Sequence, residues 1–311
     1  SRGLVGSEMC IRDSPYVDKE TDPVAYSNYV KLPGVWVLIG GMWIAHFYYW
    51  GTNQYITQRA LGGKSLDEAQ KGLMFAGFLK IFMPIVVVLP GLIAVALEGN
   101  VIESLGGDRS KAYPSMLSLL PNGILGLTFA ALVAAIVSSL ASLTNSLSTI
   151  FTMDIYKNYT KVKDTELVNV GRFAGTSGLI LSIIVAPIFL GSLDSAFQYV
   201  QEYMGLFSPV ILFVFLSAIF FKKSSSKSVL AGSLVALVVG VIMKLYVAQT
   251  DQSLIEPFMH QMAISFGIAF LVSFALSDKS DNAKVFKLTY KDFKTSKLFN
   301  YGSITILLIL S

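Results

Sequence analysis

Long apolar stretches, separated by short polar segments, make up most of this chain. A membrane-spanning α-helix needs about 20 mostly apolar residues, and most of these stretches are long enough to cross a bilayer. The pattern predicts an all-α, polytopic membrane protein with about eight spans, the last of which stops short. The predicted spans are 34–59, 68–97, 123–156, 170–190, 193–221, 229–247, 256–276 and 299–311.

The first span, 34–59, combines an apolar half with glycines and a half rich in polar and aromatic residues. Gly40 and Gly41 interrupt its apolar half, and polar side chains that include His46 and Tyr49 follow. In lipid, an unwound turn leaves backbone N–H and C=O groups unpaired unless protein, water or a ligand satisfies them. A glycine-interrupted apolar segment therefore indicates a transporter binding site. The same residues are also typical of a plain helix with a small-residue packing patch and an interfacial aromatic belt.

Two later spans carry polar residues away from their ends. Lys80 lies near the middle of 68–97, where a lysine is costly unless it faces water, a ligand or a counter-charge. A functional role is the main interpretation, and a lysine that snorkels to the interface is the alternative. In 123–156, Ala135, Ser138 and Ser139 belong to a stripe of small residues at spacings of three and four. The stripe indicates either close helix packing or a site for Na⁺, a hard cation that prefers oxygen ligands.

The fifth span, 193–221, combines polar side chains with helix breakers. Gln201 and Glu202 lie a few residues before Gly205 and Pro209. Because proline removes a helix hydrogen bond and clashes with the carbonyl four residues earlier, we expect a second broken helix here.

Composition and charge place the chain in a membrane. Hydrophobic residues make up 53% of the 311 residues and charged residues 14%, with a mean hydropathy of +0.61, whereas soluble domains carry about 25% charged residues. The net charge of +4 does not indicate nucleic-acid binding. Sixteen Lys and Arg residues lie in the loops after odd-numbered spans or at the span ends beside them, and only two lie in the loops after even-numbered spans. This alternation orients the first span from outside to inside. It predicts a multi-pass protein of the cell membrane, in a bacterium the inner membrane.

The sequence does not favour an enzyme. It has no HExxH or GxSxG motif, and its two histidines lie on different predicted spans. The single cysteine, Cys10, excludes an intrachain disulfide and a four-thiolate zinc site. Residues 1–14 match nothing downstream and look like a cloning or assembly artefact, so they and Cys10 are set aside. Residues 15–33 are interpreted as an extracellular loop.

Four motifs together resemble the sodium/solute symporters, in the sodium/glucose cotransporter branch and nearest to its bacterial sodium/galactose members. They are YYWGTNQYITQRALGGKSLDEAQKG (48–72), FLK (78–80), AAIVSSLASLTNSLSTIFTMDIYK (134–157) and FQYVQEYMGLFSP (197–209). The resemblance implies Na⁺-coupled symport of a glucose- or galactose-like sugar by alternating access. It implies Na⁺ as the coupling ion, no cofactor and no nucleic-acid partner.

The resemblance also implies a core of two inverted five-helix repeats, the architecture of the leucine transporter. By motif order, 34–221 corresponds to the second repeat and 222–311 to additional membrane helices. The first repeat, N-terminal in the family, is then a missing partner segment. We therefore expect this chain by itself to hold half of the transport site.

The resemblance assigns roles to individual residues. Tyr49 takes the place of the tyrosine that stacks on the sugar as the inner gate, and Lys80 and Gln201 take the places of residues that hydrogen-bond sugar hydroxyls. His46 stands where galactose-transporting members have a sugar-binding asparagine, which leaves the identity of the sugar open. The expected sodium ligands are Ala135, Ser138 and Ser139.

Two alternatives stay open on the sequence alone. A membrane sensor or receptor domain would use the same fold to bind a solute without transporting it. Within the transporter interpretation, proton coupling competes with sodium coupling, and Glu202 is the residue that would carry the proton.

Overall fold

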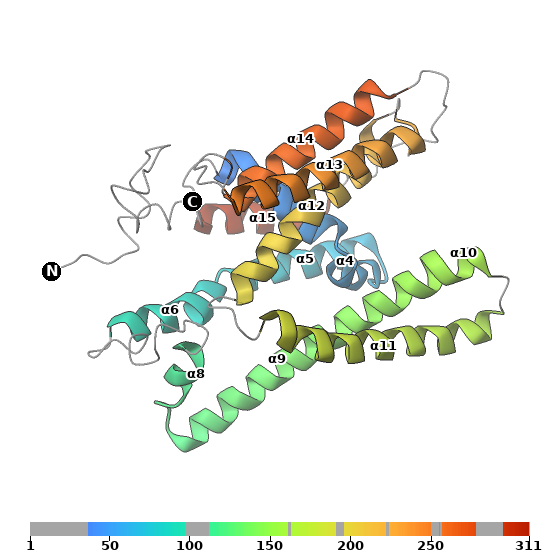
Figure 1. Ribbon diagram of the computed structural model, residues 1–311. Coiled ribbons are helices and arrows are strands. Elements are labelled where there is room, and N and C mark those ends of the chain that lie inside the picture. The colour runs from blue at the N-terminus through green and yellow to red at the C-terminus, as the bar shows by residue number, and fades with distance from the viewer. Residues whose placement is uncertain are drawn as a thin grey trace, which may run out of the picture. The chain divides into compact units, whose positions relative to one another are not determined.

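The computed structural model of the chain describes residues 37–96, 112–160, 163–190, 196–221, 224–249, 255, 257–277 and 295–310. Within them every regular element is a helix (Figure 1). Six helices are long and apolar enough to cross a membrane: Leu66–Ala94, Asn122–Tyr159, Thr165–Phe189, Tyr199–Phe220, Ser226–Val247 and Phe258–Ala275. The prediction of an all-α, multi-pass membrane protein is confirmed. The interpretations of 1–14 as an artefact and of 15–33 as a loop lie outside the described residues.

The chain divides into two compact units. The first comprises Ser1–Asn53 and Val200–Asp292, and the second comprises Gln54–Tyr199 and Phe293–Ser311. The predicted boundary between a five-helix repeat, 34–221, and additional helices, 222–311, concerns the ancestry of the fold and stays a prediction.

The first unit is built on three long helices and a short, irregular one. Its elements are η1 (Leu38–Met42), α3 (Trp43–Phe47), η2 (Tyr48–Thr52), α12 (Ala196–Phe220, from Val200 on), α13 (Ser226–Val247) and α14 (Phe258–Ala275). Small residues let α13 and α14 approach closely: Ala236 and Ala269 are fully buried, and a Cβ on Gly232 would lie 2.5 Å from the Ala269 carbonyl oxygen. Val210 and Phe213 of α12 complete this core.

Helix α12 runs unbroken through Gly205 and Pro209, so the predicted second broken helix is wrong. Pro209 is fully buried, and a Cβ on Gly205 would lie 3.1 Å from the Phe258 ring and 3.4 Å from the Met262 side chain of α14. The glycine therefore serves to bring α14 close. A membrane helix tolerates an interior proline where its neighbours hold the chain in place.

The second unit holds the remaining elements: α4 (Gln54–Leu61), α5 (Leu66–Lys80), α6 (Met83–Ala96), α8 (Ala112–Leu117), α9 (Asn122–Thr149), η4 (Ile150–Tyr156), α10 (Lys157–Tyr159), α11 (Asp164–Leu190) and α15 (Lys297–Leu310). Helix α9 continues through η4 into α10, and α11 returns beside it (Figure 1). Gly171 and Gly175 of α11 face Ser148 and Thr144 of α9, and Ser148 Oγ donates to the Gly171 carbonyl at 2.7 Å. Helix α11 begins at Asp164, earlier than the predicted start at 170.

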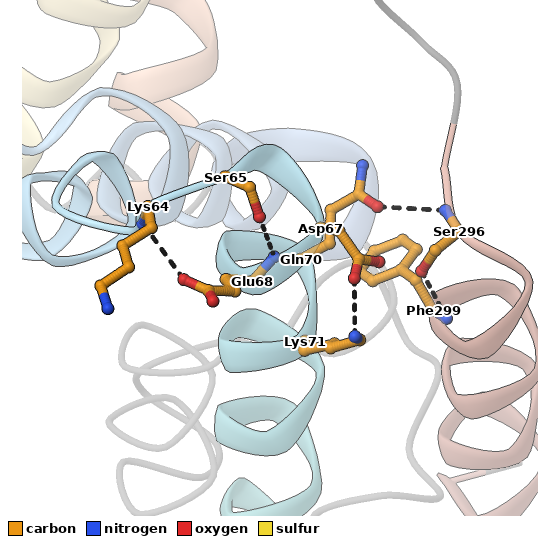
Figure 2. Close-up of polar contacts among 8 residues, drawn as sticks. All are labelled: Lys64, Ser65, Asp67, Glu68, Gln70, Lys71, Ser296 and Phe299. Carbon is orange, nitrogen blue, oxygen red and sulfur yellow. Dashed lines mark hydrogen bonds and ion pairs between the residues drawn. The ribbon is translucent and has the colours of Figure 1, made fainter.

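A polar cluster joins the N-terminal turns of α5 and α15 (Figure 2). The Ser65 hydroxyl caps α5 by accepting from the Glu68 N–H at 3.2 Å, which is the role expected of an N-cap serine. One turn later, Gln70 Oε1 accepts from the Ser296 N–H at 3.1 Å, and Ser296 Oγ in turn accepts from the Phe299 N–H. These bonds fix the start of α15 against α5.

Candidate functional site

The helix around the Gly40–Gly41 pair is interrupted. Gly40 has non-helical dihedral angles (φ −73°, ψ −111°) inside the π-helical turn η1. Gly41 is buried, and a Cβ at this position would lie 2.3 Å from the carbonyl oxygen of Met259 and 2.8 Å from its Cα. The expected break is therefore present, and so is the small-residue packing that was its alternative. The pair both opens the helix and lets α14 touch its backbone.

Beyond the break, one face of the segment packs against the core of the first unit. Ile44 is fully buried in a cluster with Leu212 of α12 and Met262 of α14. Trp43 lies edge-on to Phe266 of α14, with ring centroids 5.1 Å apart. These contacts hold the segment that carries His46 and the tyrosines.

His46 and Tyr49 lie three residues apart and so share a face of this segment. His46 is exposed and Tyr49 half-buried. Tyr48 packs against the core cluster, while the Tyr49 ring lies edge-on to Trp50 at 5.2 Å. Tyr49 belongs to the π-helical turn η2, which ends where Asn53 becomes extended (φ −77°, ψ 114°). Single π-helical turns occur frequently at functional sites.

Gln201 is exposed near the start of the unbroken helix α12. Its neighbour Glu202 forms a half-buried ion pair with Lys244 of α13, with 3.4 Å between Oε2 and Nζ. Lys244 Nζ also lies 4.0 Å from the centroid of the Tyr203 ring. Glu202 is thus part of a packed, compensated cluster between α12 and α13.

In the second unit, Lys80 is the last residue of α5 and lies at a turn, within the apolar stretch Leu66–Ala94, that the sequence analysis missed. The predicted span 68–97 consists of two helices, α5 and α6, separated by the turn residues Ile81 and Phe82. Pro84 has no N–H to offer the carbonyl of Lys80, four residues earlier. Pro84 falls in the first turn of α6, where a missing N–H costs least. Lys80 is exposed at this interruption.

Ala135, Ser138 and Ser139 lie along α9 and are exposed. The Ser138 carbonyl accepts from Ser142 Oγ at 3.0 Å. Neither the Ser138 nor the Ser139 hydroxyl is engaged by another residue that the structure describes. The two hydroxyls are therefore available as oxygen ligands, whereas Ser142 is occupied.

The sequence analysis missed a hydrogen-bonded cluster between α4 and α9. Ser142 Oγ accepts from the Arg59 guanidinium, and the Ser142 carbonyl accepts from Gln58 Nε2 at 3.2 Å. Gln58 Oε1 accepts in turn from Asn145 Nδ2 at 3.1 Å. From the sequence, Arg59 is predicted only to be one of the basic residues that set the topology. No periodic pattern links residues more than 80 positions apart, so the sequence carried no signal for this cluster.

The predicted site residues thus divide between the two compact units. His46, Tyr49 and Gln201 belong to the first, and Lys80, Ala135, Ser138 and Ser139 belong to the second. Their assigned roles stay predictions. Tyr49 and Lys80 lie at irregular turns, which is where membrane proteins expose hydrogen-bonding groups to a solute, whereas Gln201 and the α9 residues lie within continuous helices.

Comparisons with known proteins agree with these features. The model of the sodium:solute symporter family matches residues 18–272. The sodium/glucose cotransporter of Vibrio parahaemolyticus is 44% identical over 91% of this chain and 54% of its own length. Sodium/glucose cotransporter 4 of Danio rerio is 34% identical over 71% of this chain and 35% of its own, and sodium/myo-inositol cotransporter 2 of Mus musculus is 33% identical over 68% and 33%.

This chain spans about half the length of the Vibrio protein and about a third of the two animal proteins. The family match covers well over half of this chain and includes every predicted site residue. The chain belongs to the sodium:solute symporter family.

Proposed function

We propose that this chain takes part in Na⁺-coupled symport of a sugar or sugar-like solute by alternating access. The observation that carries the proposal is the 44% identity, over 91% of this chain, to a protein named as a sodium/glucose cotransporter. Relatives named for myo-inositol cotransport extend the solute class to cyclic polyols. Both kinds of solute present several hydroxyl groups on a ring.

The interrupted helices support this proposal. A buried solute with several hydroxyl groups needs donors and acceptors at membrane depth, and opened backbone is tolerated there only beside protein, water or a ligand. One such opening occurs at Gly40 in the first unit, and in the second unit a hydrogen-bonded turn at Ile81–Phe82 separates α5 from α6. Tyr49 lies nine residues after Gly40, and Lys80 directly precedes the turn. In the proposal Tyr49 covers the apolar face of the ring, and Lys80, Gln201 and His46 hydrogen-bond its hydroxyls.

Sodium is the proposed coupling ion, and its proposed ligands are the Ala135 carbonyl and the hydroxyls of Ser138 and Ser139. A hard cation prefers oxygen ligands, and these hydroxyls are available. Glu202 would have been the group for proton coupling, but it is held in an ion pair with Lys244. The contact favours a structural role for Glu202. In this proposal the first five-helix repeat of the transporter supplies the remaining ligands of the sodium ion.

Uptake measurements test the proposal. The complete transporter is reconstituted in proteoliposomes, and the entry of labelled glucose, galactose and myo-inositol is followed under an inward Na⁺ gradient, an inward K⁺ gradient and an inward proton gradient. Uptake of one or more of these solutes above the K⁺ control is expected with Na⁺ only. Uptake driven equally by the proton gradient would refute sodium coupling. Na⁺-dependent solute binding without any uptake would instead indicate a sensor.

A further inference from the structure

A cavity in the first unit is not used by the proposed transport function. It measures about 300 Å³ and is lined, among the residues described, only by phenylalanine and serine side chains of α12, α14 and the segments after them. That volume is on the order of ten water molecules and reaches the lower end of the range of small-molecule sites. The cavity is therefore large enough for part of an organic ligand.

Aromatic rings make up much of the cavity wall. Phe213, one of the lining residues, is 1% exposed. Phe270 contacts Phe221 edge-on at 4.9 Å between centroids and is nearly parallel to Phe274 at 6.4 Å. Phe274 is 65% exposed, so the ring wall continues from the protein core to the surface of a membrane-spanning helix. No charged side chain lines the cavity among the described residues, which argues against a polyol or an ion as its ligand.

A buried hydroxyl in the wall, that of Ser217, has no hydrogen-bonding partner among the described residues. Ser217 of α12 lines the cavity and is only 2% exposed. By contrast, Ser273 Oγ, also in the wall, reaches Ser228 Oγ at 3.5 Å. A buried hydroxyl without a partner costs free energy, so Ser217 favours a ligand with a single acceptor beside an apolar body.

Position and charge favour a membrane lipid. The cavity lies at the C-terminal ends of α12 and α14, beside the start of α13. The charge pattern of the sequence predicts that these ends face the cytoplasm. The sequence that follows α12 is basic, with Lys222, Lys223 and Lys227, whereas Lys279 after α14 is flanked by Asp278 and Asp281. Basic segments at the cytoplasmic ends of membrane helices attract anionic lipid head groups.

We propose that this cavity binds one acyl chain of an anionic phospholipid from the cytoplasmic leaflet. The chain lies between the phenylalanine rings, and its ester carbonyl accepts a hydrogen bond from Ser217 Oγ. The anionic head group remains at the membrane surface, on the side that the charge pattern predicts to be cytoplasmic. Occupation of this site in the α12–α14 bundle would then depend on the lipid composition of the membrane.

Photo-crosslinking tests the proposal. The chain is placed in lipid nanodiscs that contain a small fraction of phosphatidylglycerol with a diazirine on one acyl chain, and labelled peptides are mapped by mass spectrometry. Labelling is expected to concentrate on peptides that contain Phe213 to Phe221 and Phe270 to Ser277. The same diazirine on phosphatidylcholine should label them less.

Two serine variants separate lipid binding from packing. Ser217→Ala removes the donor and should lower labelling of these peptides about 2- to 10-fold, the range for one neutral hydrogen bond. Ser233→Ala is the matched control, because Ser233 Oγ in α13 is also buried and has no partner among the described residues, but does not line the cavity. Labelling should be unchanged in this variant, and thermal unfolding of both verifies that they fold.

Three results would overturn the proposal. The first is labelling spread evenly over all lipid-facing helices, which would mean that the cavity holds water or another part of the protein. The second is an equal effect of Ser217→Ala and Ser233→Ala. The third is equal labelling by the anionic and the zwitterionic lipid, which would remove the role of the head group.

Discussion

Gly41 gives the sharpest test of how the first unit is held together. A Cβ at this position would lie 2.3 Å from the carbonyl oxygen of Met259, 2.8 Å from its Cα and 2.9 Å from its carbonyl carbon. All three are backbone atoms at the start of α14, so no side-chain rotation can make room. In Gly41→Ala the two segments must therefore move apart.

The size of the effect follows from the distance. The Cβ contact must lengthen from 2.3 Å to the 3.4 Å at which ordinary contact begins, so by about 1 Å, and a gap of that size forfeits about a quarter to a half of the dispersion energy of each contact across it. Ile44 and Trp43 make such contacts with α14. Overpacking of this kind costs about 1–3 kcal/mol, and we expect the upper half of that range because the clash is with backbone.

Thermal unfolding in detergent measures the loss, with tryptophan fluorescence as the signal because Trp43 lies against Phe266 of α14. Gly51→Ala is the matched control, since a Cβ there meets nothing within 4 Å. Gly40→Ala should fall between the two, because its nearest neighbour is the His260 side chain at 3.4 Å. If Gly41→Ala unfolded at the same temperature as Gly51→Ala, the close approach to α14 would not be the reason for the glycine.

The other predictions concern transport by the complete transporter. Tyr49→Ala should abolish Na⁺-driven uptake while Tyr49→Phe keeps most of it, because the ring face and not the hydroxyl covers the sugar; equal loss in uptake assays would contradict this. Lys80→Ala should weaken sugar affinity about tenfold or more, the range for a charged hydrogen-bond donor, with a smaller change in the Na⁺ dependence of binding; unchanged affinity would make the lysine structural. Ser139→Ala should raise the Na⁺ concentration for half-maximal uptake. Ser142→Ala should instead lower thermal stability by loosening α4 from α9, and a shift in Na⁺ dependence as large as that of Ser139→Ala would favour packing as the role of both serines.

The fold class could be predicted from the sequence because the signal is physical and local. A bilayer core admits few polar residues, so long apolar stretches with basic loops leave little choice except a bundle of helices. The break at Gly40 was predictable for the same reason, since glycines followed by polar aromatics are unusual in a lipid-facing helix. The close contact of Gly41 with Met259 was not predictable, because it joins residues more than 200 positions apart.

The candidate site was only partly accessible from the sequence. Lys80 and the α9 serines could be identified from the sequence, because each stands out against the residues that precede and follow it in the same helix. The Arg59–Ser142 and Glu202–Lys244 pairs depend on which helices lie side by side. The charged residues Arg59, Glu202 and Lys244 are evident in the sequence. A single sequence does not show, however, which of its residues come into contact. Because Glu202 forms an ion pair with Lys244, the structure gives less support to the proton-coupling alternative.

The prolines of this chain show what local chemistry can and cannot decide. Pro90, Pro187 and Pro209 all lie inside continuous helices, although each removes a backbone donor. At Pro84 the chain ends one helix and begins another, and the proline occupies the first turn of the second, where its missing N–H has no intrahelical acceptor to lose. A proline therefore marks a place where a membrane helix is able to open. Neighbouring helices decide whether it does, and we propose a role in transport for the turn at Ile81–Phe82 because the cationic side chain of Lys80 lies at its edge.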